Sequence, residues 1–261
     1  MIVMKLSEVL AFSFCVLVSL SCSVKEDREV CPCRLVIDMS EVDTSVVKQA
    51  ELVVGASGSF LTRDTLSAAD FSEGYVVSVP REDVSVGVYF GADDCVDDTG
   101  RLGIDYGSEC PQVYMHSSHV RAEGEMMVER VQMVKNHCIM TIQVEAEEVF
   151  PFRLDAKGNI DGYEPGGKPS EGEFLYAMNT DDDGVCRLTL PRQTDESLVL
   201  EVHDDTGTLK TFALGEYVAA SGYDWQEENL RDITVSLDYS LTRVAISVAG
   251  WREEYVFNVV I

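Results

Sequence analysis

Cysteine is the residue whose position in this sequence most clearly indicates chemistry, and Cys22 is the strongest case. It closes an uncharged and mostly apolar stretch from Val9 to Leu20, with small residues at Ser19 and Ser21. An apolar core followed by small residues is typical of a secretory signal peptide, which is removed from the mature chain. A cysteine directly after the cleavage position is available for acylation. We therefore predict a signal peptide over residues 1–21 and a lipid on Cys22.

The apolar stretch is too short to serve as a membrane span, because a helix needs about 20 residues to cross the ~30 Å core of a bilayer. A single acyl chain binds a bilayer only marginally, whereas a triacylated cysteine would hold it stably. Residues 22–29 would then form a tether. Within it, Ser23 to Asp27 look like the lysine-plus-two-acids signal that routes some bacterial lipoproteins to the outer face of the outer membrane. The alternative is a solvated tether. We expect a surface-exposed, lipid-anchored protein of the outer membrane.

The other cysteines of the mature chain suggest disulfides. They are Cys31, Cys33, Cys95, Cys110, Cys138 and Cys186. An even number in an exported chain favours bridges, although the sequence does not choose among the pairings. We favour Cys95 with Cys110, because both flank a Gly- and Asp-rich loop whose closure a bridge would assist. A redox dithiol is disfavoured at Cys31 and Cys33, because one residue separates them instead of two and a strand follows.

Two segments have some features of a metal site. Asn179 to Gly184 matches the first half of an EF-hand loop, but position 12 is Leu190 instead of Glu, so a β-turn explains it better. His116 and His119 have the spacing of zinc ligands on a helix, but the surrounding pattern VYMHSSHV indicates a strand end or loop. We therefore predict no metal site and no cofactor.

Motifs of catalysis do not occur in the sequence, which has no G-x-S-x-G elbow, no H-E-x-x-H and no phosphate-binding glycine loop. We expect a protein that is not an enzyme. Three aromatic residues leave a glycan-binding role open, because Tyr223, Trp225 and Trp251 could stack on a sugar. The other interpretation places these rings inside the fold.

The charge of the chain excludes one class of partner. The formal net charge is −26 at pH 7, from 46 acidic and 20 basic residues. A surface this acidic repels phosphate backbones and anionic headgroups. We therefore expect no nucleic-acid partner.

Alternating apolar residues, rich in valine, recur along the chain from Leu35 to Ile261. This period of two, interrupted by Gly, Asp, Asn and Pro clusters, predicts an all-β sandwich plan. Single helical turns are expected at Thr44 to Ala50, Ser67 to Phe71 and Asp224 to Asn229. We place the domain boundary next to a Gly- and Pro-rich stretch, with an amino-terminal domain over residues 30–147 and a carboxyl-terminal domain over residues 148–261.

Several short motifs lie at the two ends of the mature chain. They are Gly222-Tyr223-Asp224-Trp225, Asp232-Ile233, Asp238-Tyr239 and Trp251 near the carboxyl terminus, and Cys31-Pro32 followed by the strand RLVIDM near the amino terminus. In these motifs the chain resembles the FimB-like family of fimbrillin-associated anchor lipoproteins. The second cysteine, Cys33, departs from the family pattern.

The resemblance implies tandem transthyretin-like (Greek-key) β-sandwich domains. It also implies a fimbrial anchor or minor subunit that holds the base of a fimbria to the outer membrane and limits its length. The implied partner is a fimbrillin-type major subunit, joined by strand addition, in which main-chain hydrogen bonds give affinity. The rival hypothesis is a surface glycan- or host-ligand-binding lipoprotein.

Strand addition directs attention to the first and last strands. In the last strand Tyr255, Phe257, Val259 and Ile261 point the same way, so it is either donated to a neighbour or completes its own sandwich. An anchor needs only one open end. We therefore expect the first strand, RLVIDM, to stay in place and close its own groove.

Overall fold

The computed structural model describes residues 31–57, 59–92, 95–145, 150–238, 240 and 243–259. The predicted signal peptide, Cys22 and the tether lie outside these residues. The strands are β1 (Cys33–Asp38), β2 (Gln49–Ala56), β3 (Ser59–Ser67), β4 (Tyr75–Val79), β5 (Asp83–Phe90), β6 (Leu102–Gly103), β7 (Tyr114–Arg121), β8 (Met126–Arg130), β9 (Val134–Lys135), β10 (His137–Glu145), β11 (Arg153–Tyr163), β12 (Pro169–Met178), β13 (Val185–Pro191), β14 (Val199–Asp204), β15 (Gly207–Phe212), β16 (Ile233–Asp238), β17 (Arg243–Val248) and β18 (Glu254–Asn258). The helices are α2 (Ala68–Glu73) and α3 (Leu214–Ala220). The predicted all-β class is confirmed.

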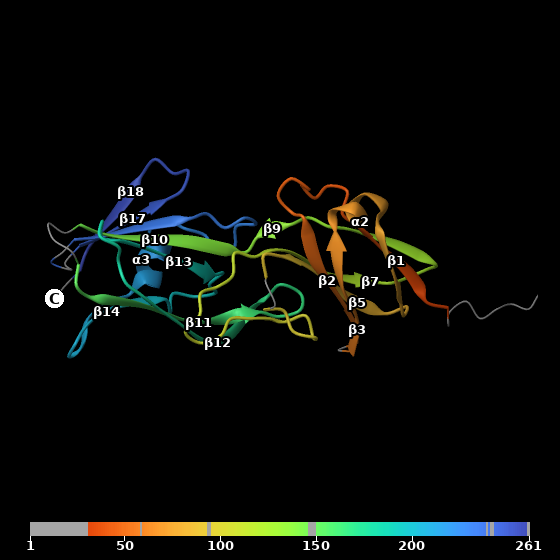
Figure 1. Cartoon of the computed structure of the whole chain (residues 1–261), viewed down its shortest axis with the longest axis horizontal. Helices are drawn as coiled ribbons and strands as arrows, with labels where there is room; N and C mark the ends of the chain where they lie inside the picture. Colours follow the sequence, from red (N-terminus) through yellow and green to blue (C-terminus); the bar gives the residue numbers. More distant parts are fainter. Residues whose placement is uncertain are drawn as a thin grey trace, which may run out of the picture.

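The strands form β-sandwich bodies arranged end to end along the long axis (Figure 1). The body that begins with β1 combines a β4-β1-β8 sheet with a β3-β2-β5-β7-β9 sheet. Alternate residues of the strands point into its core, where Leu35, Ile37, Leu52 and Val86 are buried. We call this the first body.

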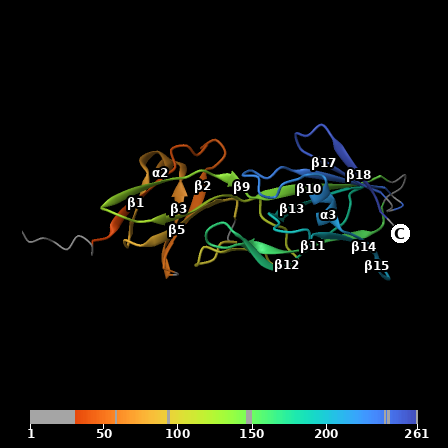
Figure 2. The ribbon, with the colours of Figure 1, turned by 180° about the vertical axis from the view of Figure 1, so that it is seen from behind.

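The second body contains the carboxyl-terminal half of the chain. It combines a β13-β10-β16-β17-β18 sheet with a β12-β11-β14-β15 sheet. Its core includes Leu154, Leu188, Val202 and Ile246. Seen from behind, the bodies keep the same end-to-end order, with β1 at one end and β18 near the other (Figure 2).

The chain passes from the first body to the second at Asn136, earlier than expected. β10 was expected in the amino-terminal domain, but it pairs with β13 and β16 along its length. A period-two pattern shows that a segment is a strand and does not show which strands it pairs with. The predicted boundary itself, between residues 147 and 148, falls in a stretch outside the described residues and stays a prediction.

A segment of the first half crosses into the second body. Residues 95–113 leave the first body after β5, and β6 within this segment pairs with β11. Val53 and Tyr89 from the first body also pack into the core of the second. The sandwiches therefore share an apolar contact in addition to the linker between them, which is formed by residues 131–136.

The helices differ in how well the sequence predicts them. α2 falls where a turn was expected, and Ser67 and Asp70 form a reciprocal capping box at its start. α3 was not expected. The predicted turns at 44–50 and 224–229 are not helical in the structure.

Candidate functional site

The first strand occupies the centre of its sheet. β1 pairs antiparallel with β4 on one side and parallel with β8 on the other. Leu35 and Ile37 have no exposed surface, and the buried side chain of Cys33 precedes them. Removing β1 would expose this row and leave a groove between β4 and β8. This is the position expected of a strand that closes its own groove.

The last strand lies at the edge of its sheet. β18 pairs antiparallel with β17, and no strand of the described residues pairs with its other edge. Phe257 stacks on Tyr217 of α3 with ring centroids 5.1 Å apart, and Tyr255 packs edge-on against Trp251 at 6.2 Å. Here the strand completes its own sandwich, with Tyr255, Phe257 and Val259 half-buried against the core. Ile261, the last candidate exchange residue, lies outside the described residues.

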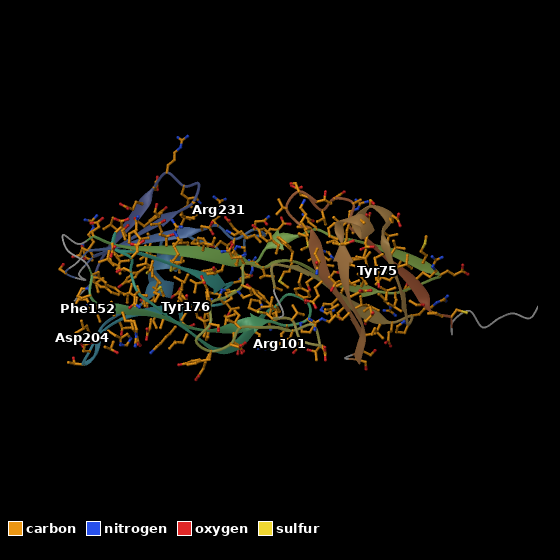
Figure 3. The ribbon with its side chains drawn as sticks, viewed as in Figure 1. Tyr75, Arg101, Phe152, Tyr176, Asp204 and Arg231 are labelled. Atoms are coloured by element: carbon orange, nitrogen blue, oxygen red, sulfur yellow. The ribbon has the colours of Figure 1, made fainter. Side chains whose placement is uncertain are left out.

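An arginine and close backbone contacts join the crossing segment to the second body. Arg101 donates from Nη2 to Asp161 Oδ1 at 2.7 Å and to Ser170 Oγ at 3.0 Å. The backbone N–H groups of Ile104 and Gly107 donate to the carbonyl oxygens of Asp161 and Leu175. Figure 3 shows Arg101 where the bodies meet.

The linker is also hydrogen-bonded to a loop of the second body, residues 221–232. Lys135 donates from its backbone N–H to Asn229 Oδ1 at 2.8 Å and from Nζ to Asp232 Oδ1 at 2.5 Å. Leu230 donates its N–H back to the carbonyl of Lys135. Gln132 donates from Nε2 to Glu228 Oε1 at 3.0 Å. These hydrogen bonds fix the linker to the second body.

Arg192 ties the same loop to the linker from inside. Its Nε donates to Asn136 Oδ1 at 3.1 Å, and its Nη atoms donate to the carbonyl oxygens of Trp225, Glu227 and Glu228. Burial lowers the pKa of this guanidinium from its ordinary value. Removing a partner from a buried charge is costly. We therefore interpret Arg192 as a structural residue that holds the loop and the linker together.

Gly166 and Gly167 bring the β11–β12 loop against β7. A Cβ at Gly167 would lie 3.0 Å from Ser117 Cβ, and one at Gly166 would lie 2.6 Å from His119 Nε2. The Gly- and Pro-rich stretch, which the sequence marks only as a loop, therefore docks onto the first body. The junction residues cannot be recognised as a group from the sequence, because their partners lie far away in the chain.

The cysteines are mostly buried thiols. Burial raises the pKa of Cys138 and of Cys186 to about 12. Burial, with the neighbouring Cys95 adding to it, also raises the pKa of Cys110. The structure contains no disulfide among the described cysteines, and the Cys95–Cys110 bridge stays a prediction.

One pairing is excluded by the register. Cys138 lies opposite Leu190, and Cys186 lies opposite Ile142. The two cysteines are therefore offset along the ladder by four residues, or about 13 Å. A bridge needs Cα atoms within about 7 Å.

His116 and His119, which have the spacing of zinc ligands on a helix, do not point to a common site. His116 and His119 lie on strand β7, where an odd separation places side chains on opposite faces. His116 Nε2 lies 2.9 Å from Glu129 Oε1, and its Nδ1 accepts the Gln132 N–H. Within the described residues, no group of three or more His, Cys, Asp or Glu side chains is placed to hold a metal ion.

The EF-hand-like segment is a turn, as expected. Asp181 Oδ1 accepts hydrogen bonds from the backbone N–H groups of Asp183 and Val185 at 3.0 and 2.9 Å. Gly184 takes a positive φ of 75° between β12 and β13. The carboxylate is therefore used to fold the turn.

Tyr223 and Trp225 are not available for a sugar-stacking platform. Tyr223 and Trp225 are only 6% and 9% exposed, and their rings pack edge-on at 4.8 Å inside the core. Tyr223 donates its hydroxyl to the carbonyl of Arg231 at 2.8 Å. Of the possible interpretations, packing inside the fold is the correct one for this pair.

Comparison with known proteins establishes a shared fold. No family model matches the chain, and no curated protein matches its sequence. The fimbrial anchor protein Mfa2 from Porphyromonas gingivalis has a similar structure, with a TM-score of 0.61 and 14% identity over 88% of this chain and 100% of that one. A proposed polysaccharide-binding protein from Bacteroides thetaiotaomicron has a TM-score of 0.61 and 14% identity over 87% and 98% of the chains. A proposed adhesin from the same species has a TM-score of 0.55 and 14% identity over 88% and 98%.

At this level of identity the likeness concerns the fold, and it covers both bodies. None of the helices among the described residues is long and apolar enough to cross a bilayer.

Proposed function

We propose that this protein is a lipid-anchored fimbrial anchor or minor subunit of the FimB-like kind. It holds the base of a fimbria to the outer membrane through Cys22 and limits fibre length by strand-addition contacts with a fimbrillin-type subunit. The role is mechanical and not catalytic. The shared fold with a fimbrial anchor and a proposed adhesin supports it.

The position of β1 is the observation that carries the proposal. A subunit in the middle of a fibre needs a groove for an incoming strand at one end and a strand to give at the other. Here β1 fills the centre of the β4-β1-β8 sheet. A tether attached to Cys22 would keep β1 in its place, so the membrane end stays closed. The open edge of β18 then provides the contact with the fibre.

The test replaces the lipid-bearing residue. Cys22→Ser should release the folded protein and the attached fibres into the medium, because nothing else among the predicted features holds them to the membrane. Cell fractionation and immunoblotting measure the release, and Cys31→Ser serves as the matched control. Fibres that stay bound to cells carrying Cys22→Ser would contradict the anchoring role.

Co-purification tests the partner. A tagged protein extracted in mild detergent should bring down a fimbrillin-like chain. If it brings down none and instead binds glycans, the rival hypothesis of a surface binding lipoprotein replaces the anchor. That rival has lost the Tyr223 and Trp225 platform that first favoured it.

A further inference from the structure

β1 is the first strand of the first body, and β8 is its last long strand before the chain passes to the second body. β1 begins at the outer end of this body, and the second body lies at the opposite end (Figure 1). β8 continues through residues 131–136 into β10 of the second body, and this stretch includes β9, which pairs with β7 of the first body over two residues. A pull between the amino terminus and the second body acts on the start of β1 and, once this short pair has opened, on the end of β8.

The two strands lie side by side and run in the same direction. Their register extends from Arg34 opposite Met126 to Asp38 opposite Arg130. The ladder is bonded at both ends, because the Arg34 N–H donates to the Glu125 carbonyl at 3.0 Å and the Val131 N–H donates to the Asp38 carbonyl at 2.8 Å.

This arrangement decides how the hydrogen bonds are loaded. Pulling the start of one strand and the end of its parallel neighbour in opposite directions slides the strands along each other. All bonds of the ladder then resist together. The antiparallel pair β1–β4 differs, because Cys33 lies opposite Val79. A pull on the start of β1 and on the turn after β4 would open those bonds one after another.

The apolar layer beneath the ladder resists the same sliding. Leu35 and Ile37 are fully buried in the core of the first body, and Met127 packs against that core from β8. Sliding by one residue would turn these side chains to the wrong face of the sheet. The ion pairs of Arg130 with Asp38 and Glu41 are longer, at 3.7 and 3.6 Å, and exposed, so they add little.

The load also has a firm path beyond β8. The linker is bonded to the loop of the second body through Lys135 and Asp232. β10, which follows it, lies between β13 and β16 in its sheet. Arg101 and Asp161 join the bodies a second time at the crossing segment.

We propose that β1 and β8 form a shear clamp that carries pulling force from the amino terminus to the second body. The origin of that force rests on the proposed anchoring through Cys22, whereas the clamp itself is a property of the folded chain. The clamp places the strongest resistance to force in the strand that follows the tether.

Single-molecule pulling on the mature chain from residue 22 tests the clamp. One handle is attached to the amino terminus and the other to residue 182, in the exposed turn between β12 and β13. In the comparison the second handle is attached to residue 82, after β4. The unfolding force should be several-fold higher with the handle at residue 182. Equal forces, or release of the second body or the junction before β1, would overturn the proposal. The length released in each event identifies the part that opens.

A pair of proline variants adds a matched control. In the parallel ladder, successive backbone N–H groups point in opposite directions. The N–H of Met127 therefore points towards β1, and the N–H of Val128 points towards the open edge of β8. Met127→Pro should lower the force measured through residue 182, and Val128→Pro should leave it nearly unchanged, because an edge N–H that faces solvent is dispensable. Circular dichroism checks that each variant folds. If Met127→Pro does not fold, the comparison of the two handle positions decides alone.

This experiment separates the clamp from the anchor. A high force in the shear direction together with no release by Cys22→Ser would leave the clamp standing and the anchor wrong. Release by Cys22→Ser together with equal forces for the two handle positions would support the anchor and show that the clamp is wrong.

Discussion

The backbone of β6 comes so close to β11 that no side chain fits between them at Gly162. This residue has a φ of 148°, and a Cβ there would lie 1.9 Å from the carbonyl oxygen of Leu102. The obstacle is backbone, which cannot turn aside as a long side chain would. At the scale of single residues, the joint between the bodies therefore depends on glycine at position 162, because glycine has no Cβ.

Gly162→Ala should separate β6 from β11 and destabilise the protein by about 3 kcal/mol or more, because backbone strain of roughly 1–3 kcal/mol adds to the clash. Gly207→Ala is the matched control, since Gly207 has a nearly equal φ of 145° and nothing within 4 Å of its added Cβ. Urea denaturation measures both. Equal losses for the two variants would show that the close approach does not matter.

The buried thiols predict a loss of stability in alkali. Cys138 and Cys186 have a pKa of about 12 in the folded protein, against 9.0 ordinarily. Because the folded-state pKa is raised, the stabilisation is complete below pH 9 and is lost as the pH rises from about 9 towards 12. Each thiol can raise the unfolding constant by up to about tenfold per pH unit in that window.

Urea midpoints measured across this pH range check the prediction. The variant Cys138→Ala with Cys186→Ala should be less stable at neutral pH, because it loses packing, but its stability should fall less steeply with pH. A slope equal to that of the unchanged protein would mean that these thiols do not ionise on unfolding.

At the scale of elements, the edge strand β18 is held mainly by its aromatic side. Phe257→Ala should cost about 2 kcal/mol, because a half-buried ring and its stack on Tyr217 are both lost. Val256→Ala should cost less than about 0.5 kcal/mol, since Val256 on the same strand is 49% exposed. Hydrogen exchange in β17 reports the local change. Equal, small effects would favour a strand that is held loosely enough to be donated.

The sequence predicts the strands better than their partners. The apolar alternation that runs from Leu35 onward correctly indicates β1 and β10 as strands, because a half-buried strand shows its two faces in a period of two. It does not indicate that β10 joins the second body, since pairing is decided by residues far away in the chain. α3 was missed for a different reason. With two buried apolar residues, Leu214 and Val218, a helix of this length gives too short a pattern to recognise.

For the candidate site too, the sequence predicts the strands but not the contacts between residues far apart in the chain. The first and last strands could be picked out from their apolar rows and their places at the ends of the chain. The junction could not, because Arg101, Gly162 and Arg192 make their contacts with residues remote in sequence.

At the scale of the whole molecule, the bodies are not independent units. Residues 95–113 belong to the first half of the chain but are bonded to the second body. A fragment of residues 22–136 should therefore fold with this segment exposed. Trypsin should cut the fragment at Arg101 much faster than it cuts the mature chain, and mass spectrometry identifies the cut. Equal rates would show that the segment is held by the first body alone.

The parallel pairing of β1 with β8 also orders the events of folding. The partner strand of β1 is made only after residues 39–125 have followed it, and contacts between segments so far apart form slowly. In a chain exported from its amino terminus, as the sequence predicts, β1 would emerge before β8 and keep one edge unpaired until β8 arrived. A chain already held to the membrane by its amino terminus would spend this interval close to the bilayer, with that edge open to pairing with another strand.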